Sequence, residues 1–87
     1  MQLNQILSNE VLQEVHRIGA GYIYNDYSGN GKWGKIFNVL HRADCHKVLR
    51  MNVNYPKYYF DTLAEAEEFI NNLRGNNWKK CDDCLHN

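Results

Sequence analysis

The first stretch with apolar residues at helical spacing covers residues 2–18. Leucine, valine and isoleucine recur there every three or four positions and form one stripe, at Leu3, Leu7, Val11, Val15 and Ile18. Gly19 follows and is typical of a helix end. Ser8 is a competing N-cap, with Leu7 and Leu12 placed as a hydrophobic staple, so the predicted helix begins near residue 2 or at residue 8 or 9.

A second amphipathic helix is predicted from about residue 62 to residue 74. Thr62 and Glu65 have the spacing of a capping box, in which each side chain satisfies a free backbone amide of the first turn. The apolar stripe consists of Leu63, Ala66, Phe69, Ile70 and Leu73. Arg74 complements the helix dipole at the carboxyl end, and Gly75 is placed to end the helix.

Three further segments favour β-strands. Residues 20–41 read as a hairpin, because two runs rich in aromatic and β-branched residues, GYIYNDY and WGKIFNVLH, flank the turn-forming sequence SGNG. In the second run, alternation places Val39 and His41 on one face and Asn38 and Leu40 on the other, which the polar Asn38 suggests is only partly buried. Residues 57–60, KYYF, predict a third short strand.

The order of these elements predicts one small α+β domain over residues 1–87. It comprises a short antiparallel sheet, an N-terminal helix, and a second helix before a C-terminal cysteine pair. A chain of 87 residues buries only a limited apolar core. Domains of this size often depend on a disulfide, a metal ion or a partner for stability.

Composition and charge narrow the class of protein. Apolar residues make up 44% of the chain and charged residues 23%, which is globular composition. Ten Lys and Arg balance ten Asp and Glu, which argues against a histone-like or polybasic binder. No apolar run approaches the roughly 20 residues of a membrane span, so no membrane partner is expected. The N-terminal sequence lacks a cationic and apolar leader, which predicts a cytoplasmic protein.

Three cysteines and one histidine have the spacing of a metal site. Cys81 and Cys84 form a C-x-x-C, and His41 and Cys45 form an H-x-x-x-C upstream of it. Three cysteines and one histidine are a standard tetrahedral set for zinc, and a structural Zn²⁺ would staple a domain whose core is small. The predicted ligands are His41, Cys45, Cys81 and Cys84, with His46 or His86 as alternatives to His41.

Two other interpretations of the cysteines stay open. They can be free thiols, since buried cysteines without metal are common. The C-x-x-C can also be a redox pair, although the intervening Asp82 and Asp83 should raise the thiol pKa values, whereas redox pairs need them lowered.

The segments HRADCHKV, KYYFDTLAEAEEF and NWKKCDDC together resemble the zinc-binding module at the N-terminus of the Ada DNA-repair protein and related small zinc modules beside nucleases. The resemblance covers residues 41–84 and implies a structural zinc fold. In the Ada module all four ligands are cysteines, and the first accepts a methyl group from DNA. His41 stands at that position here, and a zinc-bound imidazole cannot act as the activated nucleophile. The resemblance therefore implies no methyl transfer, and no other catalytic pair is evident, so we expect a protein that is not an enzyme.

The balanced net charge hides a basic middle segment. Residues 30–58 contain six Lys and Arg against one Asp, a net charge of +5. Basic residues interleaved with aromatic ones suit contacts to nucleic-acid phosphates and bases. The predicted contact residues are Arg42, Lys47, Lys79, Lys35 and Arg50, with Trp33 and Tyr58 as stacking groups. The alternative is a protein–protein interaction module, a small regulator or inhibitor that docks through the N-terminal helix and the aromatic hairpin.

Overall fold

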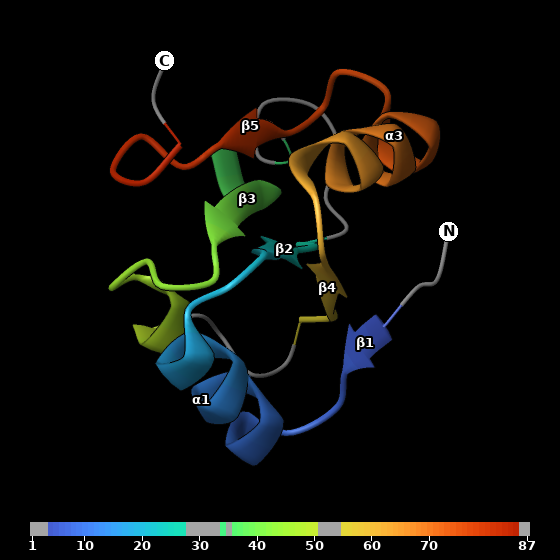
Figure 1. Cartoon of the computed structure of the whole chain (residues 1–87). Coiled ribbons are helices and arrows are strands. Elements are labelled where there is room, and N and C mark those ends of the chain that lie inside the picture. The colour runs from blue at the N-terminus through green and yellow to red at the C-terminus, as the bar shows by residue number, and fades with distance from the viewer. Residues whose placement is uncertain (1–3, 28–33, 35, 51–54, 86–87) are drawn as a thin grey trace.

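A five-stranded sheet separates the two main helices of the computed structural model, which describes residues 4–27, 34, 36–50 and 55–85 (Figure 1). The elements in chain order are β1 (Asn4–Ile6), α1 (Asn9–Ile18), β2 (Tyr22–Asn25), β3 (Val39–Arg42), η1 (Val48–Arg50), β4 (Lys57–Phe60), α3 (Leu63–Arg74) and β5 (Lys79–Lys80). The predicted α+β class is confirmed.

The strand order across the sheet is β1-β4-β2-β3-β5. The first three pairings along this order are antiparallel, as the sequence predicts. The fourth is parallel, because β5 runs beside β3 with Val39 opposite Lys79 and Leu40 opposite Lys80. The sheet is therefore mixed, and the parallel pair joins the C-terminal cysteine turn to the middle of the chain.

The N-terminal helix begins at the later of its two predicted starts. Ser8 is the N-cap, and its hydroxyl accepts a hydrogen bond from the amide of Val11 at 3.2 Å. Residues 4–6 form a strand instead, paired antiparallel with β4. The alternative start near residue 2 is wrong. As a strand, this segment buries Ile6 in the core and leaves the neighbouring Leu7 82% exposed. Gly19 ends the helix with a left-handed φ of 78°.

The central hairpin is confirmed in its pairing but not in its length. β2 pairs with β3 from Tyr22 opposite Arg42 to Asn25 opposite Val39. The second strand begins only at Val39, since residues 36 and 37 are helical and the amide of Asn38 donates to the carbonyl of Gly34 at 2.8 Å. Asn38 is fully buried, contrary to expectation, and its side-chain amide donates to the carbonyl of Asn77 at 2.9 Å. The SGNG turn lies outside the described residues.

The second long helix follows its sequence signals closely. Thr62 is the N-cap of α3, and the Thr62 hydroxyl accepts from the amide of Glu65 at 3.2 Å. Gly75 follows the last helical residue with a φ of 61°. The strand predicted at residues 57–60 is also confirmed, as β4.

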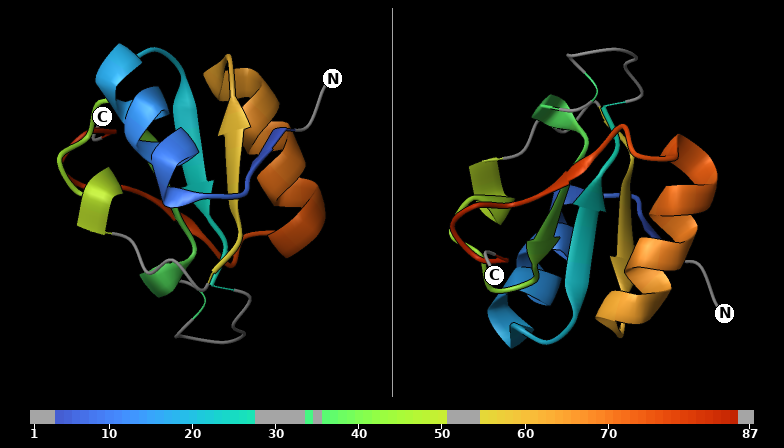
Figure 2. Two further views of the ribbon diagram at one scale, coloured as in Figure 1. Left: turned by 90° about the horizontal axis from the view of Figure 1, so that it is seen from below. Right: turned by 90° about the horizontal axis from the view of Figure 1, so that it is seen from above.

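Each face of the sheet carries its own apolar core (Figure 2). The core beside α3 contains Tyr24, Leu40, Phe60, Ala66 and Ile70. The core beside α1 contains Ile6, Leu12, Ile23, Ala43, Cys45, Val48 and Cys81. Two of the predicted metal ligands thus belong to the packed interior on the α1 side.

Candidate metal centre

The four predicted ligands come from two segments that the parallel β3–β5 pair brings together. His41 lies in β3, and Cys45 lies in the turn that follows it. Cys81 and Cys84 follow β5, and the amide of Cys81 donates to the carbonyl of Leu40 at 2.8 Å. Figure 1 shows the C-terminal loop beside the turn after β3. The strand pairing therefore places residues some 40 positions apart in the sequence around one point.

Their ligand atoms have the spacing of a coordination shell. One ligand atom each from His41, Cys45, Cys81 and Cys84 lies within 4.8 Å of the other three. The Sγ atoms of Cys45 and Cys81 are 3.9 Å apart. Zn–S bonds of about 2.3 Å in a tetrahedron place sulfur atoms about 3.8 Å apart. The chain thus forms a cluster that can hold a metal ion with little rearrangement.

His41 has a buried ring nitrogen that no protein group satisfies. The residue is 6% exposed, and its Nδ1 has no hydrogen-bond partner among the described residues. The pKa of His41 is lowered to about 4, because burial disfavours the imidazolium and the ammonium of Lys47 adds repulsion. The ring is therefore neutral at pH 7, with a lone pair available for a metal.

Backbone amides support the thiolate form of Cys81. Burial raises the pKa of Cys81, but hydrogen bonds from the backbone at Asp83 and Cys84 outweigh burial and lower it. The pKa of Cys84 is raised to about 12, chiefly by burial and also by the neighbouring Cys45 and Cys81, although the amide of Arg42 donates to the Cys84 sulfur at 3.2 Å. The expectation that Asp82 and Asp83 raise both thiol pKa values is therefore wrong for Cys81.

Neither alternative histidine is found in the described ligand cluster. His46 is exposed, and its Nε2 lies 3.4 Å from a carboxylate oxygen of Asp83, outside the ligand cluster. His86 lies outside the described residues.

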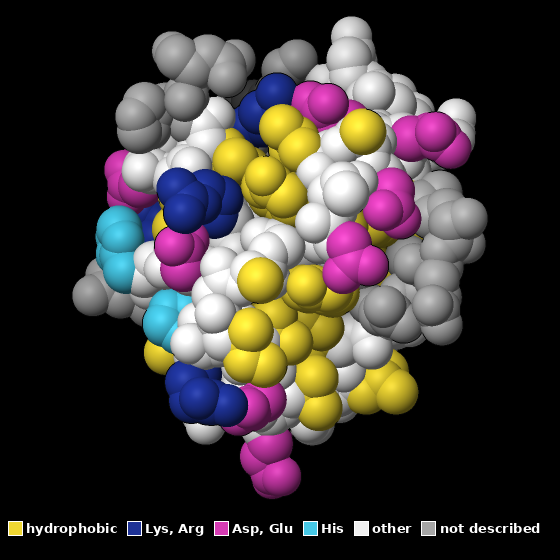
Figure 3. Space-filling model, viewed as in Figure 1, with side chains coloured by type: hydrophobic (Ala, Val, Ile, Leu, Met, Phe, Trp, Pro, Cys, Tyr) yellow, Lys and Arg dark blue, Asp and Glu magenta, His cyan; other side chains and the backbone are white. Residues whose placement is uncertain are grey.

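The basic side chains around the cluster are ion-paired with acidic neighbours. Arg42 lies 3.0 Å from Asp44. Lys47 lies 3.1 Å from Asp83, and Lys79 lies 3.5 Å from Asp82. Figure 3 shows acidic side chains beside the basic ones on this face of the molecule. Two cations of the basic middle segment, Arg42 and Lys47, are therefore paired near the cluster, and the partner of Lys47 comes from the C-terminal turn, which the net charge of residues 30–58 leaves out.

The remaining predicted contact residues are dispersed or undescribed. Tyr58 is half-buried on the α3 side of the sheet, with its ring centroid 5.2 Å from that of Phe69. Arg50 belongs to η1, and nothing is described of its side chain. Trp33 and Lys35 lie outside the described residues. A nucleic-acid role for these residues stays a prediction.

Sequence reasoning missed the main-chain contribution to the cluster. The Arg42 amide on Cys84 Sγ depends on backbone position alone and leaves no trace in residue types. The positive charge of Lys47, which helps to lower the pKa of His41, was also missed as a part of this site.

Comparison with known proteins finds no protein-family model, curated protein or solved structure that matches this chain. Among the helices that the structure describes, none combines the length and the apolar character needed to cross a bilayer.

Proposed function

We propose that the chain is a small binding module built around a structural zinc ion held by His41, Cys45, Cys81 and Cys84. The observation that carries this proposal is the buried, neutral side chain of His41, which belongs to a cluster with three thiols and whose Nδ1 lacks a hydrogen-bond partner among the described residues. A buried polar atom without a partner costs about 1–3 kcal/mol. A metal bond to Nδ1 removes that cost, and the single N–H proton of the neutral imidazole is then on Nε2.

Zinc is the metal that this donor set favours. Three thiolates and one imidazole are soft to borderline donors that suit a d¹⁰ ion without geometric preference, while Mg²⁺ and Ca²⁺ require oxygen ligands. Four protein ligands also fill a tetrahedral shell and leave no position for water or substrate. The proposed centre is accordingly structural, and the module is not an enzyme.

Stoichiometry and folding together test the metal centre. The purified protein should carry about one equivalent of zinc by elemental analysis, and a strong chelator should abolish its near-UV circular dichroism. Cys81→Ser or Cys84→Ser should remove both zinc and cooperative folding, while His46→Ala should retain both. Full near-UV dichroism in the metal-free protein would overturn the structural role.

The proposed partner of this module is nucleic acid, contacted through the basic middle segment. Support comes from the net charge of +5 over residues 30–58. The ion pairs of Arg42, Lys47 and Lys79 are at least partly exposed to solvent. Exposed pairs of this kind contribute little free energy, so phosphates can compete with Asp44, Asp83 and Asp82 for these cations.

Fluorescence anisotropy with labelled single- and double-stranded oligonucleotides at low salt tests this partner. If three to five phosphates are neutralised, log affinity should fall against log salt with a slope of about −3 to −5. Absence of binding to either form at tens of micromolar protein would eliminate nucleic acid as the partner.

A protein partner is the second candidate, and one observation favours it. The outer side of the α1 region exposes Leu7 at 82%, Val11 at 47% and Ile18 at 63%. Val11 and Ile18 are seven positions apart on α1 and therefore share one helix face, and Leu7 lies directly before the N-cap Ser8. A triple change to Leu7→Gln, Val11→Gln and Ile18→Gln should weaken partner binding and leave oligonucleotide binding unchanged if the two surfaces are separate.

A further inference from the structure

An aromatic pocket lies at one end of the sheet, apart from the metal cluster. Asn25, Tyr27, Phe37 and Tyr55 line a cavity of about 380 Å³. Asn25 ends β2, Tyr55 precedes β4, and Phe37 belongs to the short helical turn before β3. Figure 2 shows the end of β2, the start of β4 and that green turn at the same edge of the molecule. Cavities of a few hundred Å³ are the usual size for small ligands.

Three rings form the walls of this pocket. The centroid of Tyr27 lies 5.2 Å from that of Phe37 at an interplanar angle of 49°. It lies 5.0 Å from that of Tyr55 at 69°. Phe37 is 43% exposed, so part of its ring surface is open to a ligand. Rings in this tilted arrangement offer faces and edges to a flat ligand that enters between them.

The fourth wall is the carboxamide of Asn25. Its Oδ1 is buried and has no hydrogen-bond partner among the described residues. The carboxamide carries an acceptor, Oδ1, beside a donor, Nδ2, and a half turn of the amide plane exchanges their positions. Oδ1 is buried, so such a half turn brings it to a ligand, and a ligand that donates to it removes the cost of the unpaired acceptor.

The charges around the pocket argue against a cationic ligand. No carboxylate is among the lining residues that the structure describes. The ammonium of Lys57 lies 2.9 Å from the carbonyl oxygen of Tyr55, and Lys57 pairs across the sheet with Asn25. Aromatic cages for methylated ammonium groups rely on cation–π attraction, which a nearby fixed ammonium opposes. An uncharged aromatic ligand meets no such repulsion.

We infer that the pocket formed by Asn25, Tyr27, Phe37 and Tyr55 binds a nucleobase: a flat, uncharged heteroaromatic ring with a donor beside an acceptor on its edge. Asparagine pairs with the adenine amino group and N7 in this two-point manner. Aromatic side chains stack on unpaired bases. The inference is independent of the metal centre, since no lining residue is a proposed metal ligand.

Titration of the zinc-loaded, ¹⁵N-labelled full chain with adenosine tests the pocket. The backbone amides of Asn25, Tyr27 and Phe37 should shift together and saturate, with a Kd of about 1 mM or tighter. Phe37→Ala should weaken binding by at least about fivefold, because one stacking wall is lost. Leu73→Ala is the matched control, since Leu73 is exposed to the same degree, 44% against 43%, on α3.

Two further ligands identify the chemistry. N⁶,N⁶-dimethyladenosine keeps the ring but lacks the amino protons. It should therefore bind the parent protein more weakly than adenosine does, whereas the Asn25→Ala protein should bind the two ligands with equal affinity. Tetramethylammonium should produce no shift. No saturable shift with adenosine at 5 mM, or tighter binding of tetramethylammonium than of adenosine, would overturn the inference.

The same experiment distinguishes the source of the base. If the pocket takes a base from a single strand, a short oligoadenylate should bind at least tenfold more tightly than adenosine and shift the same residues. If the base belongs to a free nucleotide, AMP should bind as tightly as the oligoadenylate. A double strand should not shift these residues in either case, because its bases are stacked and paired.

Discussion

Asp26 and Arg74 form a two-point ion pair that joins the end of β2 to the last turn of α3. The Nε and Nη2 atoms of Arg74 each lie 2.9 Å from a different carboxylate oxygen of Asp26. The Asp26 side chain is 6% exposed and that of Arg74 is 19% exposed. The buried hydroxyl of Tyr24 donates to the same carboxylate at 3.1 Å, and burial together with the carboxylate raises the pKa of Tyr24.

Truncation of one partner of this pair should be costly. Arg74→Ala leaves a buried carboxylate with only part of its hydrogen bonds, and we expect a loss of about 2–4 kcal/mol in the free energy of unfolding. Urea denaturation followed by circular dichroism measures this loss. The pair of Arg17 and Glu14 on the exposed surface of α1 is the control, and Arg17→Ala should leave stability unchanged. Equal losses of stability for Arg74→Ala and Arg17→Ala would contradict the stabilising role of the buried ion pair.

Gly21 is a position where only glycine fits. Its φ is 89°, and an added Cβ would lie 2.5 Å from the Tyr59 hydroxyl and 2.7 Å from the carbonyl oxygen of Phe60. Gly75 also has a positive φ, of 61°, but an added Cβ there meets nothing within 4 Å. Gly21→Ala and Gly75→Ala therefore both strain a backbone with positive φ, while only the first adds a clash with backbone.

We expect Gly21→Ala to lower the midpoint of thermal unfolding by at least twice as much as Gly75→Ala does. Differential scanning calorimetry on both variants with zinc bound measures the difference. Similar midpoints for the two variants would mean that β4 can move away from Gly21 without cost, contrary to the packing between β2 and β4.

Much of the fold could be predicted because its signals are local. The N-caps at Thr62 and Ser8 each involve residues three positions apart, and each hydroxyl accepts the expected amide hydrogen bond. The Glu65 carboxylate accepts from the Thr62 hydroxyl at 3.2 Å. The C-x-x-C and H-x-x-x-C spacings likewise indicated four residues that the fold does bring together.

The rest could not be predicted because it depends on distant partners. Asn38 is a polar residue that is fully buried, and its acceptor is a carbonyl 39 residues away. The two-residue strand Lys79–Lys80 has no apolar alternation, and only its pairing with β3 defines it. The net charge of residues 30–58 likewise left out Asp83, which comes from the C-terminal turn and lies 3.1 Å from the ammonium of Lys47.

His41 should bind the metal through Nδ1. Long-range ¹H–¹⁵N spectra of the zinc-loaded protein should show a metal-bound Nδ1 and a protonated Nε2, because Nδ1 is the buried nitrogen without a partner. His41→Cys should retain the metal as a four-thiolate centre, and His41→Ala should weaken binding far more than His46→Ala. When ¹¹³Cd replaces zinc, the ¹¹³Cd resonance of the His41→Cys protein should move toward the chemical shift of a site with four sulfur ligands. Unchanged zinc affinity in His41→Ala would exclude His41 as a ligand.

Asp83 should weaken nucleic-acid binding in the parent protein. Its carboxylate lies 3.1 Å from the ammonium of Lys47 and 3.4 Å from Nε2 of His46, so it competes with phosphate for both groups. Asp83→Asn should therefore increase oligonucleotide affinity, and the slope of log affinity against log salt should become steeper by about 1 as Lys47 gains a phosphate contact. Arg42→Gln combined with Lys47→Gln should instead make the slope shallower by about 2.

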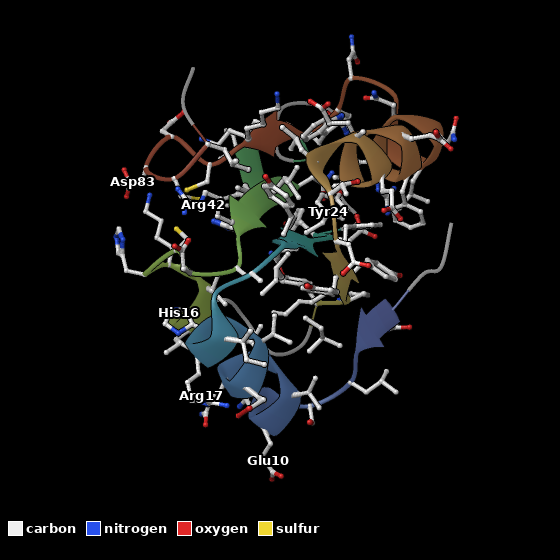
Figure 4. All side chains as sticks on the ribbon, in the orientation of Figure 1. Glu10, His16, Arg17, Tyr24, Arg42 and Asp83 are labelled. Atoms are coloured by element: carbon white, nitrogen blue, oxygen red, sulfur yellow. The ribbon has the colours of Figure 1, made fainter. Side chains whose placement is uncertain are left out.

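Glu10→Gln is the matched control for Asp83→Asn, since it changes the net charge equally but lies at the opposite end of the molecule, on α1 (Figure 4). Fluorescence anisotropy at several salt concentrations measures all three variants, with zinc content verified for each. If the proposed interface is correct, Glu10→Gln changes affinity only slightly, because charges farther apart than about 10 Å are screened at 0.1 M salt. Equal gains from Glu10→Gln and Asp83→Asn would show a response to net charge alone, and the contact surface around Lys47 would then be wrong.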